Sequence, residues 1–139
     1  MAENLDRLIL ELIQYPSELP WLELKHENYD PKTIGEDICA LANGAALEGK
    51  HAAYFLWGID DSTHEILGTE HNLQNLKKGN QELENWLRSL LSQNADFEYQ
   101  AVSVCGHTVG VLTIQPAVFQ PVTFEKTAYI RVGSYTKKL

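Results

Sequence analysis

The sequence predicts a sheet built around one apolar run, Ala52-Ala53-Tyr54-Phe55-Leu56-Trp57-Gly58-Ile59. The run is too short for a typical helix and rich in aromatic side chains, as expected for a strand that is covered on both faces. It is therefore the predicted middle of the sheet. The next residues, Asp60-Asp61-Ser62-Thr63, have the composition of a turn, and we expect residues 64–68 to return as an antiparallel partner.

Three other segments have apolar residues at helical spacing. The second begins with Thr33 followed three residues later by Glu36, which is the pattern of a capping box. Helices are predicted over residues 5–13, from Thr33 to about residues 43–48, and over residues 83–91.

The remaining segments are rich in β-forming residues. Gly106 can adopt the positive φ of a tight hairpin between residues 97–104 and 108–114. Shorter strands are expected at residues 21–25 and 127–132, whereas residues 133–139 are interpreted as the start of a further element. Together these elements predict an α+β fold with a mixed sheet, in one domain spanning residues 1–139.

Acidic residues gather near two of the predicted strands. Residues alternate along Trp21-Leu22-Glu23-Leu24-Lys25, so Glu23 shares a face with Lys25 and lies opposite the leucines. Glu18 precedes this strand, and Asp60 and Asp61 end the apolar run. Carboxylates that meet from neighbouring strands can hold Mg²⁺ or Mn²⁺, although such residues at strand ends are more often solvated.

Composition limits the function further. The 139 residues carry 11 Lys and Arg against 19 Asp and Glu, a net charge of −8 that opposes simple electrostatic binding of a polyanion. The tail is locally basic, with Lys126, Arg131, Lys137 and Lys138. Cys39 and Cys105 are interpreted as buried, reduced thiols. With no apolar stretch of membrane-spanning length, we expect a soluble cytoplasmic protein without a membrane partner.

Several familiar motifs fail on inspection. Residues 44–50 have the GxxxxGK spacing of a phosphate-binding loop, but His51 replaces the required hydroxyl and a helix precedes the glycines. The histidines lack the spacing of a zinc site. Trp21 is left open: its indole either packs in the core or lies exposed beside Lys25, where it could contact a nucleotide.

Short motifs follow one another in order along nearly the whole chain. They are Glu18, Leu22-Glu23-Leu24-Lys25, residues 38–43, Gly58-Ile59-Asp60-Asp61 and Tyr129-Ile130-Arg131-Val132-Gly133-Ser134. In this order, and with a helix between the second and the fourth, the chain resembles the AlbA-type DNA-binding domain that is shared with the Schlafen proteins. The resemblance implies a nucleic-acid partner, either DNA or structured RNA.

The resemblance also implies a longer protein. Such domains form the N-terminal part of transcriptional regulators and of RecG-related ATP-dependent DNA helicases, so a C-terminal remainder is expected, although this chain itself has no ATPase motif. In the Schlafen branch the domain is a metal-dependent endoribonuclease. That branch implies Glu18, Glu23 and either Asp60 or Asp61 as catalytic residues, with Glu18, Glu23 and Asp60 as ligands of Mg²⁺ or Mn²⁺.

Three hypotheses therefore stay open. The first is a nucleic-acid-binding module in which Lys25, Arg131, Lys137 and Lys138 contact phosphates. The second is the metal-dependent nuclease. The third is a protein-interaction domain with an acidic surface, in which Glu23 and Lys25 form an ordinary ion pair on one face of the sheet.

Overall fold

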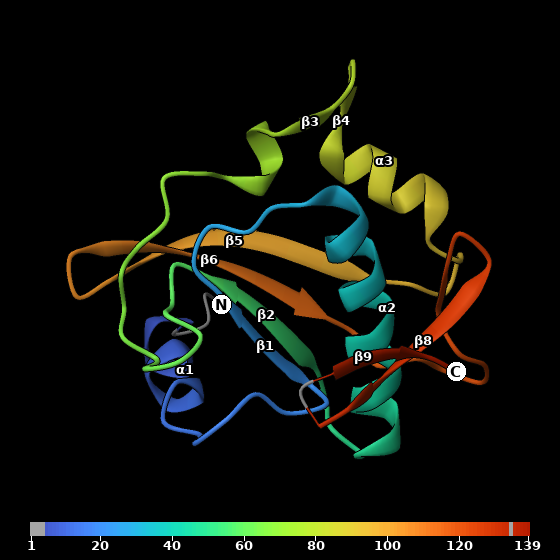
Figure 1. The fold of residues 1–139 in the computed structure, drawn as a ribbon, viewed down its shortest axis with the longest axis horizontal. Coiled ribbons are helices and arrows are strands. Elements are labelled where there is room, and N and C mark those ends of the chain that lie inside the picture. The colour runs from blue at the N-terminus through green and yellow to red at the C-terminus, as the bar shows by residue number, and fades with distance from the viewer. Residues whose placement is uncertain (1–4, 134) are drawn as a thin grey trace.

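In the computed structural model, residues 5–133 and 135–139 are described, and they form a four-stranded sheet, helices and a smaller sheet (Figure 1). The elements are α1 (Leu5–Leu12), β1 (Leu22–Lys25), α2 (Pro31–Leu47), β2 (Ala53–Trp57), the 3-10 helix η1 (Leu73–Asn75), β3 (Lys77–Lys78), β4 (Gln81–Glu82), α3 (Leu83–Leu90), β5 (Phe97–Val104), β6 (His107–Ile114), β7 (Thr123–Phe124), β8 (Thr127–Val132) and β9 (Tyr135–Lys138).

The main sheet has the order β1-β2-β6-β5 and is mixed, as predicted. β1 runs parallel to β2, whereas β2 with β6 and β5 with β6 are antiparallel. β2 thus has neighbours on both sides, and Phe55, Leu56 and Trp57 are fully buried in it. The prediction that this apolar run forms an interior strand is confirmed, because four of the five side chains of β2 are buried and only Tyr54 is partly exposed.

The long helix α2 crosses the main sheet (Figure 1), and its capping residue lies three residues earlier than predicted. Asp30, not Thr33, caps it, because the Asp30 carboxylate accepts the backbone N–H of Thr33 at 3.0 Å. Pro31 then occupies the first turn, where its missing N–H costs nothing. The helix ends at Leu47, within the expected range.

The small sheet β7-β8-β9 packs on α2 through buried polar contacts. The amide of Asn43 accepts the N–H of Val122 at 2.8 Å and donates to the carbonyls of Val122 and Tyr129 at 3.0 and 2.8 Å. The thiol of buried Cys39 donates to the Val122 carbonyl at 3.0 Å. These side chains satisfy backbone groups of the small sheet that would otherwise be buried without partners.

Four sequence interpretations need correction. Residues 64–68 do return antiparallel to the end of β2, with the N–H of Asp60 donating to the Glu65 carbonyl and that of Leu67 to the Gly58 carbonyl, but they form no strand, since the pairing is one isolated bridge between Ile59 and Ile66. The last residues are not a separate element, since β9 folds back on β8. Cys105 is exposed at the tip of the β5–β6 hairpin. The fourth correction is the N-cap of α2, which is Asp30 and not Thr33.

The helices of the described residues were compared with the requirements for a membrane-spanning segment. None of them has the combination of length and apolar character that crossing a bilayer requires.

The contacts of Asn43 lead to a stability prediction. Asn43→Ala leaves the N–H of Val122 buried without a partner and removes one donor each from the carbonyls of Val122 and Tyr129, so we expect the free energy of unfolding to fall by about 3 kcal/mol. The measurement is urea denaturation followed by circular dichroism. Asn75→Ala, at an exposed position of η1, is the matched control and should change stability by less than about 0.5 kcal/mol. Equal stability of the two variants would contradict the role assigned to Asn43.

Candidate functional site

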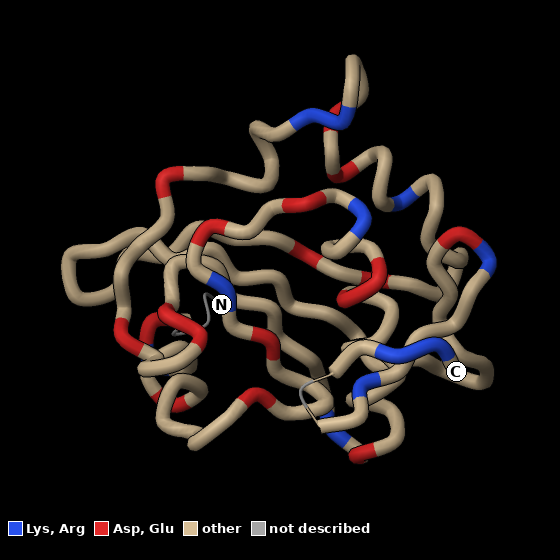
Figure 2. Tube along the Cα trace, viewed as in Figure 1, with Lys and Arg blue, Asp and Glu red and all other residues tan. Residues whose placement is uncertain are grey.

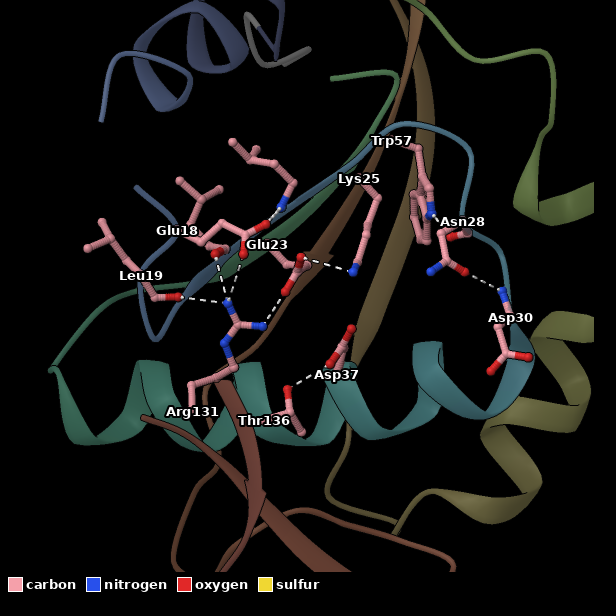
Figure 3. Close-up of polar contacts among 12 residues, drawn as sticks. Glu18, Leu19, Glu23, Lys25, Asn28, Asp30, Asp37, Trp57, Arg131 and Thr136 are labelled. Carbon is pink, nitrogen blue, oxygen red and sulfur yellow. Dashed lines mark hydrogen bonds and ion pairs between the residues drawn. The ribbon is translucent and has the colours of Figure 1, made fainter. Parts of the chain in front are cut away.

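Charged side chains from three elements and from the segment before β1 converge where β1, α2, β8 and β9 meet (Figure 3). Glu23 and Lys25 come from β1, Asp37 from α2 and Arg131 from β8, while Glu18 lies in the segment before β1. Figure 3 shows Arg131 reaching past the side of α2 toward Glu18 and Glu23. We call these five residues the charged cluster.

Arg131 is the centre of the charged cluster. Only 4% of the residue is exposed, and its guanidinium forms an ion pair and hydrogen bond with the Glu23 carboxylate. The same guanidinium lies 3.8 Å from Glu18 Oε1 and donates to the Leu22 carbonyl at 3.4 Å. Lys25 Nζ lies 3.6 Å from the other Glu23 oxygen, and this same-face pair was expected from strand alternation. Both oxygens of Glu23 therefore face cations.

Glu18 and Asp37 bind protons unusually strongly. Burial, a hydrogen bond with Glu23 and the charge of Glu23 together raise the pKa of Glu18 to about 8. Glu18 Oε2 also accepts the N–H of Leu24 at 2.9 Å. Burial and then the charge of Glu23 raise the pKa of Asp37 to about 6, although the hydroxyl of Thr136 donates to Asp37 at 2.8 Å. Three carboxyls thus face two cations, and near neutral pH Glu18 retains a proton.

This arrangement does not fit a divalent cation. The oxygens of Glu23 that would ligate a metal contact Arg131 and Lys25 instead. Asp60 accepts the N–H groups of Ser62 and Thr63 in its own turn through Oδ1, and Asp61 is exposed in that turn. Within residues 5–133 and 135–139, no group of three or more His, Cys, Asp or Glu side chains is placed to hold a metal ion. The structure therefore brings Glu18 and Glu23 together, but with an arginine rather than with Asp60.

The predicted phosphate-contacting residues are divided by the fold. Lys137 and Lys138 are exposed on β9, and Lys25 is partly exposed beside Glu23. Arg131 is buried and lies on the face of β8 and β9 opposite Lys137. Trp21 is also buried, in an edge-to-face contact with Tyr15, and Lys50 Nζ lies 4.8 Å from its ring. The open question about Trp21 is settled in favour of core packing.

Sequence reasoning missed Asp37 and the partnership of Arg131 with Glu23. A signal for Asp37 was present, because it lies three residues after Ile34 and four before Leu41, on the apolar face of the helix. A carboxylate on such a face requires a partner inside the protein. No local pattern connects Arg131 with Glu23, since 108 positions separate them.

Comparison with known protein families identifies the family of this chain. The family model described as "Schlafen, AlbA_2" matches residues 18–139. The chain belongs to the Schlafen AlbA_2 family. The matched range contains every member of the charged cluster, from Glu18 to Arg131, and no curated protein sequence matches the chain.

Two of the solved structures that match this chain show the same fold. One is the N-terminal domain of "Putative ATP-dependent DNA Helicase RecG-related Protein" from Nitrosomonas europaea, with a TM-score of 0.60, 23% identity, and coverage of 97% of this chain and 92% of that one. The other is the DIP2311 protein from Corynebacterium diphtheriae, with a TM-score of 0.58 and 16% identity. That match covers 86% of this chain but only 25% of the DIP2311 chain. Identities this low establish a common fold.

The buried ion pair leads to a second stability prediction. Arg131→Met leaves the Glu23 carboxylate buried beside Lys25 alone, so we expect a loss of about 3 kcal/mol in unfolding free energy. Adding Glu23→Gln to Arg131→Met should recover part of this loss, because no unpaired buried charge remains. The measurement is a double-mutant cycle by urea denaturation, with Arg7→Met at an exposed position of α1 as control. Additive effects of the two substitutions would contradict the pairing.

The raised pKa of Glu18 predicts a pH dependence. Because the folded protein holds this proton more tightly than the unfolded chain does, the resulting stabilisation is complete below about pH 4.5 and is lost as the pH rises toward 8. Relative to wild type, Glu18→Gln should therefore gain on the order of 1 kcal/mol or more between pH 5 and pH 8.

This comparison requires denaturation curves of wild type and Glu18→Gln at each pH. Glu11→Gln, an exposed position on α1, serves as the matched substitution. A stability difference between Glu18→Gln and wild type that stays constant from pH 5 to pH 8 would show that Glu18 does not retain a proton.

Proposed function

We propose that this domain binds nucleic acid and contacts phosphates with Lys137 and Lys138 on β9 and with Lys25 on β1. The observation that carries the proposal is the adjacent, exposed lysine pair on the edge strand of the small sheet. Membership of the AlbA_2 family and the fold shared with the RecG-related protein support it. Strand alternation places the two ammonium groups on opposite faces of β9, so they can contact phosphates on either side of this edge strand; a phosphate backbone is recognised largely through charge.

The acidic composition of the chain is compatible with phosphate binding at β9. Around Arg131, the carboxyl of Glu18 retains a proton near neutral pH and Glu23 is neutralised by two cations. Figure 2 shows the lysines of β9 as a continuous basic stretch near the C-terminus, with many acidic positions on other segments. A polyanion that approaches β9 therefore meets less negative charge than the net charge of −8 suggests.

The proposal is restricted to binding, without cleavage. Glu18 and Glu23 contact a guanidinium where a metal-dependent nuclease would hold its cation, so these residues provide no support for metal-activated hydrolysis.

We further propose that the domain acts within a longer, cytoplasmic helicase-related or regulatory protein. This chain spans about a quarter of the DIP2311 chain, which shows that the fold occurs as one part of a larger polypeptide. A small nucleic-acid-binding module would then hold the substrate for the remainder of the protein.

Binding is tested by fluorescence anisotropy with short labelled duplex DNA, single-stranded DNA and hairpin RNA at increasing salt. We expect wild type to bind at least one of these with an affinity that falls as salt rises. Lys137→Ala/Lys138→Ala should weaken binding and reduce the slope of log affinity against log salt by about 2, one for each lost phosphate contact.

Lys77→Ala/Lys78→Ala is the matched control, because it removes another adjacent, exposed lysine pair, on the β3–β4 hairpin. This control variant should retain wild-type affinity and slope. Absence of binding to every probe at low salt, or equal losses in the two double variants, would overturn the proposal.

A further inference from the structure

The two faces of the β8–β9 hairpin differ sharply in character. Residues paired across antiparallel strands lie on the same face, and the register pairs Arg131 with Thr136. Arg131 and Thr136 point inward, to Glu23 and Asp37. The opposite face carries Val132, Tyr135, Ile130, Lys137 and, by continued alternation, Leu139.

This outer face is unusually apolar for a surface that also carries lysine. Tyr135 is 76% exposed, Leu139 is 69% exposed and Val132 is 54% exposed. Lys137 lies between Tyr135 and Leu139 along the same strand face, so an aromatic ring, an ammonium group and an aliphatic side chain follow one another on one line.

A strained turn presents another aromatic side chain next to this face. The N–H of Gln120 donates to the carbonyl of Val118 at 2.8 Å, and Phe119 between them has φ of +70°. These features define a γ-turn with a left-handed central residue, a conformation that is costly for a bulky side chain. The Phe119 ring contributes nothing to the core, since the residue is fully exposed. Such strain combined with an exposed aromatic ring is characteristic of a binding site.

An apolar groove connects the two features. Its volume is about 330 Å³, and its lining includes Phe119, Ile130, Leu139 and Leu47. Ile130 and Leu139 belong to the outer face of the β8–β9 hairpin, so the groove continues that face toward the Phe119 turn. Its volume lies at the lower end of the range of ligand pockets, roughly 300–1,000 Å³.

We propose that the outer face of the β8–β9 hairpin and the Phe119 groove bind single-stranded nucleic acid, with Phe119 and Tyr135 stacking on bases and Lys137 contacting a phosphate. This inference rests on the proposed nucleic-acid binding and specifies its ligand. Bases of a duplex are stacked on one another, so only an unpaired strand offers base faces to these rings. Stacking requires no base-specific contact, so the site is expected to tolerate different sequences.

The charges favour this occupant over an apolar protein segment. The four groove residues named above carry no charge, but Lys137 lies on the same face and pairs with Ile130, whereas Lys138 lies on the opposite face of β9. A single strand presents alternating apolar bases and negative phosphates, which matches alternating aromatic or aliphatic side chains and lysine.

The test compares three probes of equal length by fluorescence anisotropy: oligothymidylate, an abasic single strand and a duplex. We expect wild type to bind oligothymidylate more tightly than the abasic strand. Phe119→Ala should weaken oligothymidylate binding by about 10-fold, as for one lost base stack, without changing its salt slope. The same substitution should have no effect on the abasic strand. Lys137→Ala/Lys138→Ala should instead reduce the salt slope on both single strands.

Two variants separate stacking from general loss of apolar surface. Val118→Ala removes an exposed aliphatic side chain from the same turn and should leave binding unchanged. Phe119→Trp keeps an aromatic ring and should retain the preference for oligothymidylate over the abasic strand. Circular dichroism establishes that each variant is folded.

The outcomes distinguish this inference from the proposed function. If the lysine substitutions weaken binding but Phe119→Ala does not, the domain binds nucleic acid and the stacking site is wrong. If wild type binds no probe, both proposals fall. If wild type self-associates in sedimentation and Phe119→Ala is monomeric with unchanged affinity for oligothymidylate, the Phe119 groove is a protein contact and the inference is overturned.

Discussion

The buried guanidinium of Arg131 connects the two sheets of this domain. It extends from β8 in the small sheet to Glu23 on β1 in the main sheet, past the side of α2 (Figure 3). An unpaired charge at that depth would cost several kcal/mol, so each partner requires the other to be in place. The position of β8 relative to β1 is therefore specified by charge as well as by the packing of Asn43 and Cys39.

The same contact determines how the β8–β9 hairpin is oriented. With Arg131 and Thr136 directed inward, alternation places Tyr135 and Lys137 on the outside. Sequence reasoning assigned Arg131 to a phosphate. In the structure Arg131 instead anchors the β8–β9 hairpin, and we propose that the other face of this hairpin binds single-stranded nucleic acid. A surface of this kind can exist on an acidic chain because Glu18, Glu23 and Asp37 are either protonated or paired behind it.

Local patterns predicted much of the fold. The apolar run at β2, the periodic helices α1 and α3, and the β5–β6 hairpin need only neighbouring residues to define them. Errors arose at the ends of the predicted strands. β9 forms because residues 135–138 fold back on β8, and residues 64–68 make only one bridge with the end of β2, while the next N–H, that of Thr69, donates to the Thr108 carbonyl at 2.8 Å.

In the candidate site, too, local relations could be predicted from the sequence and long-range contacts could not. Residue identity and strand alternation were enough to place Glu23 beside Lys25, because that relation spans two residues of one strand. They also identified an exposed lysine pair near the C-terminus. Tertiary structure alone brought Arg131 to Glu23, buried Asp37 in the charged cluster and placed the Phe119 turn at one groove with Ile130 of β8. Burial and charge pairing between segments far apart in the chain depend on how the sheets pack, and no periodicity in the sequence encodes that packing.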